Sequence, residues 1–571
     1  MKKILSYLKQ YKKECVLAPL FKMLEATFEL IVPLVIAYMI DNGTEEFSVA
    51  VKCFCILISL GVVGLVASVT AQYFAAKAAT GFSKELRHDL FEHILKFNFK
   101  QIDESGTSTL ITRLTSDVNT LQNGVNMFLR LFLRSPFIVI GAMVMAFSID
   151  VKCALIFVIV IAILGLCLLF IMKTNIPLLK KAQGGLDVIT RITRESLLGL
   201  RVIRAFTTEN KQTDKFSDSN DEYTSMALKA GRVSGLLNPL TYVVINLGIA
   251  ALVIVGKGRV DTHVLTTGSV VALYNYMSQI LLEMIKFANL IITINKAIAG
   301  SVRVSEVFKI DTNESIEELP KHLNDYLIEF DRVSFKYNEG ADDAVSNISF
   351  GIKKGETFGI IGGTGAGKTT VANLMAGYYK PLSGDVYLDG KNLKSISSKS
   401  INDKIGMCFQ KAILFEGTIR DNLKWGNKEA TDEEINEALR ISECSKVVEE
   451  KGGLEGIVNI EGKNFSGGQR QRLSIARAII RHPEILVFDD SFSALDYLTD
   501  LRIRTNIKNL GFKPTVIIIA QRCSSVLDAD KIMVLDDGEV VGLGSHDELL
   551  SSCEVYREIY NSQQYEKGGE E

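Results

Sequence analysis

The most informative stretch of the sequence is a short apolar run followed by a glycine-rich loop: Thr357-Phe358-Gly359-Ile360-Ile361-Gly362-Gly363-Thr364-Gly365-Ala366-Gly367-Lys368-Thr369. The first part predicts a β-strand, and the last eight residues match GxxxxGK[ST], a phosphate-binding pattern when it stands between a strand and a helix. We expect Lys368 to reach the β and γ phosphates of a nucleotide and the Thr369 hydroxyl to coordinate Mg²⁺. A plain glycine-rich turn is the alternative, and it leaves the flanking strand and helix unexplained.

A second apolar run, residues 485–488, ends in the acid Asp489. A carboxylate at the C-terminal end of a strand is the group expected to hold Mg²⁺ beside a phosphate loop. Around both motifs, short β-branched runs such as residues 515–520 alternate with helical patterns, which predicts a parallel α/β sheet. The C-terminal half is therefore predicted to be an α/β nucleotide-binding domain.

The composition of the 571-residue chain points to a membrane. Hydrophobic residues make up 47 % of the chain and charged residues only 23 %, and the mean hydropathy of +0.19 is high for a soluble protein. With 64 Lys and Arg against 66 Asp and Glu, there is no electrostatic case for a nucleic-acid partner. The nine cysteines show no CxxC pair and no Cys/His metal spacing, which favours reduced thiols over disulfides.

Long apolar runs fill the first half of the chain. At ~1.5 Å rise per residue, about 20 helical residues cross a hydrocarbon core of ~30 Å. We expect six crossings, near residues 15–40, 53–76, 127–149, 153–172, 233–256 and 270–294. The predicted domains are an all-α transmembrane domain over 1–304, an acidic linker over 305–325 and a nucleotide-binding domain over 326–571. The apolar runs argue against a soluble ATPase.

The charges beside these runs predict their orientation. Residues 2–13 place apolar and lysine side chains at helical spacing, as in a helix lying on a membrane surface. Residues 41–48 carry acids and no Lys or Arg, whereas 84–113 and 173–215 are rich in both. The positive-inside rule then places the N-terminus and, after six crossings, the nucleotide-binding domain in the cytoplasm. We expect a multi-pass protein of the plasma membrane.

A third motif, Asn464-Phe465-Ser466-Gly467-Gly468-Gln469-Arg470-Gln471-Arg472, lies between the two nucleotide motifs. Its Ser-Gly-Gly-Gln resembles the signature of ATP-binding cassette (ABC) proteins. In that family two cassettes enclose two ATP molecules, each between one chain's phosphate loop and the other chain's signature. The resemblance implies that Ser466, Gly467, Gly468 and Gln469 contact ATP held by a partner chain, with backbone amides at a helix N-terminus.

Other cassette elements occur in family order. Tyr337 is placed like the aromatic residue that stacks on adenine, with a core tyrosine at a strand edge as the alternative. Gln410 matches the loop glutamine that senses Mg²⁺ and contacts the membrane domain, with a solvated glutamine as the alternative. Residues 493–496 match the loop that couples the two sites. The implied ATP-binding residues of this chain are Tyr337, Gly362, Gly363, Thr364, Gly365, Ala366, Gly367, Lys368, Thr369, Thr370 and Gln410, and the implied Mg²⁺ ligands are Thr369, Gln410 and Asp489.

The order of the domains extends the resemblance over nearly the whole chain. A membrane domain of about six helices fused ahead of a cassette is similar to an ABC exporter half-transporter, which implies the type I exporter fold, also called type IV. By position, residues 106–115 and 207–215 correspond to the coupling helices of the family, with an ordinary solvated surface as the alternative.

Two catalytic positions depart from the family pattern. Asp490 stands where the family has the glutamate that polarises the attacking water, and Gln521 stands where it has the histidine that holds the γ-phosphate. Asp is one methylene shorter, and a base must lie within ~3 Å of the proton it takes. Gln donates a hydrogen bond but carries no charge. Together with the intact signature, this pattern resembles the degenerate-site subunit of heterodimeric bacterial exporters, often multidrug exporters.

The function implied is export of drugs, lipids or other hydrophobic compounds by a heterodimer, with ATP bound by this chain in a slow site. A second half-transporter, membrane lipid and a hydrophobic small molecule are the expected partners. Two alternatives stay open. One is a homodimer with slow hydrolysis, and the other is an ATP-gated channel or regulatory membrane protein in which ATP only dimerises the cassettes.

The charged residues within the predicted crossings include Glu25, Glu29, Glu283 and Lys286. Charge inside a membrane is costly and usually faces a partner or a water-filled path. Glu25 and Glu29 are four residues apart and share a helix face, while Glu283 and Lys286 are three apart and can pair. These residues are candidates either for a substrate pathway or for simple pairing.

Overall fold

The computed structural model describes residues 2–43, 46–312, 317–322, 325–338, 340 and 342–565. It forms two compact units. The membrane unit consists of Met1–Lys96 and Ser105–Asp311, and the α/β unit consists of Phe97–Glu104 and Thr312–Glu571. Parts of the predicted linker, residues 313–316 and 323–324, and the C-terminal residues 566–571 lie outside the described residues.

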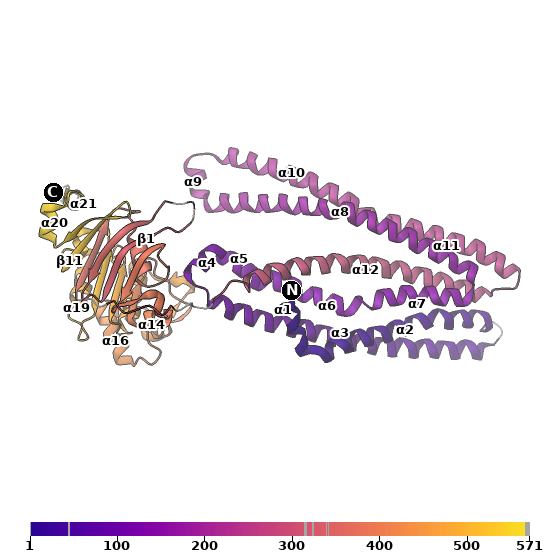
Figure 1. Ribbon diagram of the computed structural model, residues 1–571. Coiled ribbons are helices and arrows are strands. Elements are labelled where there is room, and N and C mark those ends of the chain that lie inside the picture. The colour runs from indigo at the N-terminus through magenta and orange to yellow at the C-terminus, as the bar shows by residue number, and fades with distance from the viewer. Residues whose placement is uncertain are drawn as a thin grey trace. The chain divides into compact units, whose positions relative to one another are not determined.

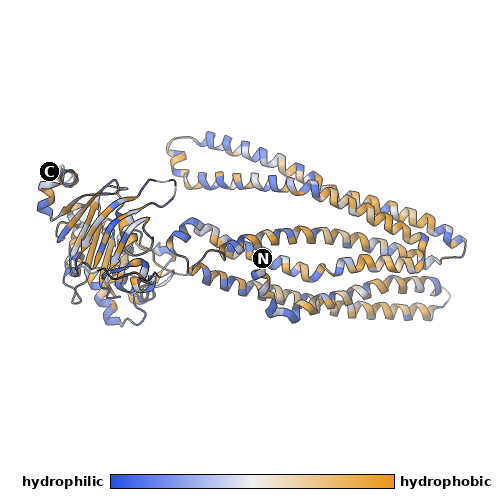
Figure 2. Ribbon diagram, in the orientation of Figure 1, coloured by the Kyte–Doolittle hydropathy of each residue, from blue (hydrophilic) through white to orange (hydrophobic). Residues whose placement is uncertain are grey.

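Six helical segments among the described residues are long and apolar enough to cross a membrane: Lys3–Asn42, Phe47–Leu95, Thr107–Ile149, Val151–Leu198, Glu209–Asp261 and Thr267–Val307. Figure 2 shows hydrophobic residues along much of these segments, whereas residues 209–235 are largely hydrophilic. The predicted number of apolar helices is therefore confirmed. The segments contain 40 to 53 residues each, whereas a bilayer needs about 20, so the helices extend well beyond the hydrocarbon region.

Two groups of helices make up most of the membrane unit (Figure 1). One group consists of α2 (Lys12–Asn42), α3 (Phe47–Leu95), α6 (Val118–Leu131), α7 (Arg134–Ile149) and α12 (Thr267–Val307). The other consists of α8 (Val151–Leu198), α9 (Leu200–Ala205), α10 (Glu209–Gly235) and α11 (Leu237–Asp261). The short elements α4 (Phe99–Ser105), α5 (Thr107–Thr112) and η2 (Arg113–Asp117) lie between α3 and α6 in sequence. Buried alanines such as Ala26, Ala142 and Ala272 let the helices approach closely.

The N-terminal segment differs from the single surface helix predicted over residues 2–13. It forms the short helix α1 (Lys2–Ser6) and the 3-10 helix η1 (Tyr7–Tyr11). The backbone leaves helical geometry at Tyr11, with φ −110° and ψ 32°, before α2 begins. Ile4 is buried, and the Tyr7 hydroxyl donates a 2.7 Å hydrogen bond to Asp89 of α3. These contacts with the protein replace the lipid contacts predicted for Ile4.

The α/β unit is built on two main sheets. In the part of the chain that the structure describes, the larger sheet has the order β12-β11-β3-β10-β9-β6 and is parallel except for the β11–β12 pair. Its strands are β3 (Thr357–Gly362), β6 (Ile405–Cys408), β9 (Ile485–Asp489), β10 (Thr515–Ala520), β11 (Lys531–Asp536) and β12 (Glu539–Gly544). The smaller sheet is antiparallel and contains β2 (Val345–Ile352), β1 (Ile328–Phe335), β4 (Ser383–Leu388) and β5 (Lys391–Asn392). The predicted α/β class is thus confirmed.

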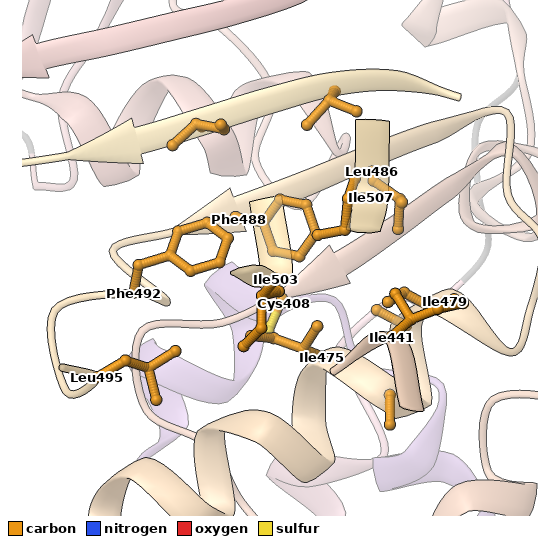
Figure 3. Close-up of a cluster of buried hydrophobic side chains, with 14 of the residues drawn as sticks. Cys408, Ile441, Ile475, Ile479, Leu486, Phe488, Phe492, Leu495, Ile503 and Ile507 are labelled. Carbon is orange, nitrogen blue, oxygen red and sulfur yellow. The ribbon is translucent and has the colours of Figure 1, made fainter. Parts of the chain in front are cut away.

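The helices of this unit include four that matter for the site: α13 (Lys368–Met375), α18 (Gly467–Ile479), α19 (Tyr497–Lys508) and α21 (Glu554–Tyr565). The others are α14 (Ser398–Lys404), α15 (Ile419–Lys424), α16 (Asp432–Ile441), α17 (Ser445–Glu450) and α20 (His546–Ser552). Phe488 of β9 lies in one apolar cluster with Ile475 of α18 and Ile503 of α19 (Figure 3). β9 is buried along its whole length, which is why its sequence is a continuous apolar run without alternation.

Candidate nucleotide site

The phosphate loop connects β3, which ends at Gly362, to α13, which begins at Lys368. A side chain at position 362 would place its Cβ 2.1 Å from the Leu535 carbonyl oxygen of β11. Gly367 has a φ of +91°, a left-handed conformation that only glycine adopts without strain. The backbone therefore requires glycine at both ends of the loop.

Lys368 is the first residue of α13 and is only 7 % exposed. Its Nζ donates hydrogen bonds to the carbonyl oxygens of Gly362, at 2.9 Å, and Gly363, at 2.5 Å. Burial lowers the pKa of the Lys368 amine, and the nearby carboxylates of Asp490 and Asp489 act in the opposite direction. The ammonium group lies folded over the loop, where phosphate oxygens can replace the two carbonyls as acceptors.

Thr369 and Asp489 form the oxygen-rich side of the site. The Thr369 hydroxyl donates a 3.0 Å hydrogen bond to Asp489 Oδ1. Asp489 is 2 % exposed, and burial raises the pKa of its carboxyl. The hydrogen bond from Thr369 opposes this rise in the pKa. A hydroxyl and a carboxylate on rigid elements are the hard donors that Mg²⁺ prefers, so the residues present fit a magnesium nucleotide.

Asp490 and Gln521 come together at the carboxyl ends of two neighbouring strands, β9 and β10. Asp490 has a φ of +47°, a conformation in which Asp is more common than most residues. Gln410 Nε2 donates a 3.2 Å hydrogen bond to Asp490 Oδ2. Asp490, Ser493 and Gln521 line one cavity of about 440 Å³. The two positions that depart from the family pattern thus face the same space.

Tyr337 follows β1 and is 42 % exposed. Its hydroxyl lies 3.2 Å from Thr370 Oγ1, one residue beyond Thr369. Its ring meets the ring of Tyr379 edge to face, with 5.3 Å between the centroids. At this exposure, part of the Tyr337 ring surface is accessible and can stack on a base.

The signature residues begin helix α18. Ser466 is the N-cap: its Oγ accepts a 3.3 Å hydrogen bond from the Gln469 amide, and Gln469 Oε1 accepts a 2.9 Å hydrogen bond from the Ser466 amide. The Ser466 O–H and the Gln469 NH₂ stay available as donors. A side chain at Gly467 would meet nothing within 4 Å, whereas one at Gly468 would approach the Ala494 carbonyl oxygen to 3.0 Å.

A segment from the membrane half of the sequence packs within the α/β unit. The Phe99 ring of α4 stacks on Tyr378, with 4.2 Å between the centroids. The Tyr379 hydroxyl donates a hydrogen bond to Asp103. Burial raises the pKa of Tyr379, and the hydrogen bond to the Asp103 carboxylate raises it further. Phe97–Glu104 therefore belongs to the α/β unit, whereas residues 106–115, predicted to correspond to a coupling helix, belong to the membrane unit. The coupling role of residues 106–115 stays a prediction.

The same aromatic residues extend toward both sides of the nucleotide site. Tyr378 also stacks on Phe409, with 5.9 Å between the centroids, and Gln410 is the next residue. Tyr379 contacts the Tyr337 ring. Tyr378 and Tyr379 were not predicted as site residues, although an adjacent pair of tyrosines just after the phosphate-loop helix is visible in the sequence.

The four charged residues singled out in the membrane unit are paired with one another or with two further cations, Lys22 and Arg134, which the sequence alone did not single out. Arg134 donates to Glu29 at 2.8 Å and to Glu283 at 2.6 Å. Lys286 donates to Glu283 at 2.8 Å, and Lys22 donates to Glu25 at 2.5 Å. The predicted pairing of Glu283 with Lys286 is therefore present, within a network that joins α2, α7 and α12.

Six apolar helices and a phosphate-loop α/β domain in one chain define a membrane protein that binds nucleotide. Comparison with known families identifies it further: the ABC transporter transmembrane region matches residues 15–284, and the ABC transporter domain matches residues 345–493. The chain belongs to the ABC transporter family, as an exporter half-transporter with one membrane domain and one ATP-binding domain.

Individual relatives agree with this assignment. YfiB of Bacillus subtilis (strain 168), an uncharacterized ABC transporter ATP-binding protein, is 33 % identical over 100 % of both chains. YgaD of the same organism, whose name assigns it provisionally to multidrug export as an ATP-binding/permease protein, is 27 % identical over 99 % of both chains. The structure of a bacterial Atm1-family ABC exporter with ATP bound has a TM-score of 0.79, with 23 % identity over 97 % of this chain and 98 % of that one. The predicted exporter fold is confirmed.

Proposed function

We propose that this chain is one half of a heterodimeric exporter, with a slow ATP site of its own and a signature that completes the fast site of a different partner chain. The observation that carries the proposal is the shared cavity of Asp490 and Gln521. Asp490 has a short carboxylate held by Gln410, and Gln521 brings no charge to the γ-phosphate. Loss of a well-placed general base typically costs about 10²- to 10⁴-fold in rate.

ATP and Mg²⁺ are the proposed ligands of this chain. The loop from Gly362 to Thr370 would hold the phosphates, Tyr337 would stack on adenine, and Thr369 and Asp489 would hold Mg²⁺. Gln410 is proposed as a further Mg²⁺ ligand, and its contact with Asp490 keeps its side chain beside the site. Ser466, Gly467, Gly468 and Gln469 would contact the partner's ATP through the open N-terminus of α18.

Exposed apolar side chains around α9, between α8 and α10, support the proposal that a second protein chain binds here. Leu198 is 83 % exposed and Phe206 is 74 % exposed. This turn lies in the Lys- and Arg-rich stretch predicted to be cytoplasmic, next to the predicted coupling residues 207–215. Large apolar side chains outside the membrane favour a protein partner, and the partner's ATP-binding domain is the proposed one.

Hydrophobic compounds such as drugs or lipids are the proposed substrates, moved outward across the plasma membrane, and the name of the relative YgaD supports this class. Glu29 and Lys286 are the accessible members of the charge network, with side chains 41 % and 45 % exposed. They are the proposed polar contacts of a substrate pathway. The N-terminus and the ATP-binding domain are proposed to face the cytoplasm.

The test is ATP turnover by the purified chain without a partner. We expect binding of Mg-ATP with turnover well below about 1 to 10 s⁻¹, an ordinary catalytic rate, measured against a phosphate-loop variant to exclude contaminating ATPase. Ordinary turnover by the lone chain would contradict the slow site. ATP-driven dye uptake into inverted vesicles containing both halves would support export, whereas ATP-dependent ion conductance without uptake would support a channel.

A further inference from the structure

The C-terminal helix α21 holds the loop that follows β10. Gln563 Oε1 accepts a 2.8 Å hydrogen bond from the Cys523 amide, and Gln563 Nε2 donates a 2.8 Å hydrogen bond to the Gln521 carbonyl oxygen. Arg522 lies between these two residues with an extended backbone, φ −94° and ψ 126°. In an extended chain, the carbonyl before a residue and the amide after it point to the same side. One glutamine side chain therefore pairs with the loop as a neighbouring strand would.

The helix that carries Gln563 has a separate anchor. Tyr556 is fully buried, in the same apolar cluster as Cys523 and Val526. Its hydroxyl lies 2.7 Å from His546 Nδ1. Tyr556 and Gln563 are seven residues apart, which places them on one face of the helix, two turns apart. Because Tyr556 fixes the helix, a change at Gln563 alters the hydrogen bonds to the loop without releasing the helix.

We propose that Gln563 is a positioning residue for ATP turnover, which acts by fixing the peptide groups on both sides of Arg522. The hydrogen bond to the Gln521 carbonyl restricts rotation of the Gln521 backbone. The direction in which the Gln521 side chain points is then restricted as well. Gln563 also lines the cavity that Gln521 shares with Asp490. The inference rests on the proposed role of Gln521 beside the γ-phosphate, and it adds the C-terminal helix to the parts of the chain that set the rate.

The experiment uses Gln563→Ala in the full chain, reconstituted in lipid nanodiscs. Hydrogen exchange of the segment containing residues 521–525 should speed up, because the Cys523 amide loses its acceptor. Single-turnover hydrolysis should slow about threefold to tenfold, the effect expected when one or two hydrogen bonds are lost to water. Mg-ATP affinity should stay within about twofold of the wild type, since the phosphate loop is untouched.

Two further variants separate positioning from simple packing. Gln563→Glu keeps the size of the side chain but turns an acceptor oxygen toward the Gln521 carbonyl, so it should slow turnover at least as much as alanine does. Ser562→Ala is the matched control: Ser562 lines the same cavity, and its hydroxyl bonds the Ile559 carbonyl of its own helix. It should leave turnover unchanged.

Unchanged exchange in Gln563→Ala would overturn the proposal, and so would faster exchange with unchanged turnover or wild-type turnover in Gln563→Glu. The exchange and turnover rates of each variant are compared as ratios to those of the wild-type chain. A fast wild-type rate would contradict the proposed slow site, but it would leave the ratios as a valid test of Gln563.

Discussion

Asp490 differs from the glutamate of the family by one methylene, in a backbone conformation with φ +47° that suits Asp better than Glu. We therefore expect Asp490→Glu alone to restore only part of the hydrolysis in this chain's site, because Gln521 still lacks a charge for the γ-phosphate. The double variant Asp490→Glu with Gln521→His should exceed the product of the single effects, since both side chains face one cavity. Single-turnover rates measure this.

Asp490→Asn is the control variant for the role of Asp490 as a base. Asn keeps the size of the side chain and tolerates the same φ but cannot act as a base, so it should abolish the residual rate. If the rate increase of the double variant equals the product of the increases of the two single variants, Asp490 and Gln521 do not act on the same water.

Helix α4 packs in the α/β unit although its sequence lies between two membrane helices. Tyr379→Phe removes the hydrogen bond to Asp103 but keeps the ring against Tyr337. We expect substrate transported per ATP hydrolysed to fall by about threefold, as the loss of one hydrogen bond allows, with ATP affinity unchanged. Dye transport and ATPase assays on the same vesicles measure the ratio. Phe99→Leu should lower it as well, and an unchanged ratio in both variants would exclude α4 from coupling.

The charge network that joins α2, α7 and α12 is expected to contribute to the stability of the membrane unit. Arg134→Met takes one of its two cationic partners from Glu283, whose side chain is 4 % exposed, and leaves it only Lys286. Breaking a buried ion pair typically costs about 3 to 5 kcal/mol, so the thermal midpoint in detergent should fall clearly. The triple variant with Glu29→Gln and Glu283→Gln should recover most of the loss, because the carboxylates that faced Arg134 are then neutral, and Lys286, which loses Glu283, has a side chain that is 45 % exposed. A triple variant as unstable as Arg134→Met would point to lost packing instead.

The elements that the sequence predicts are those encoded by contiguous residues. The phosphate loop, the buried run of β9 and the six apolar helices each carry their own periodicity or motif. The missed contacts join residues far apart: Arg134 and Glu283 are 149 positions apart, and Tyr379 and Asp103 are 276 apart. Local patterns cannot choose such partners, because many charged and aromatic residues along the chain have the same chemistry.

For the whole molecule, the proposed asymmetric heterodimer predicts that damage to the signature costs more activity than damage to the phosphate loop. Gly467→Asp should abolish most ATPase and transport when co-expressed with the wild-type partner, because a carboxylate would face the partner's γ-phosphate. Within this chain the substitution is tolerated: a side chain at position 467 meets nothing within 4 Å, and an acid suits the first turn of α18. Ser466→Arg should also abolish most ATPase and transport, but it removes the N-cap of α18 as well.

Lys368→Ala should reduce activity less than Gly467→Asp, because it weakens ATP binding only in the slow site and leaves the fast site chemically complete. It is the matched variant, since both changes lie at a helix N-terminus that is proposed to contact phosphate, and each is proposed to affect one of the two sites. ATPase and vesicle transport of the two complexes, at equal expression, give the comparison. Equal and complete loss in both would mean that the sites are equivalent. The chain would then work as a symmetric pair, and Asp490 and Gln521 would be working catalytic residues in their own right.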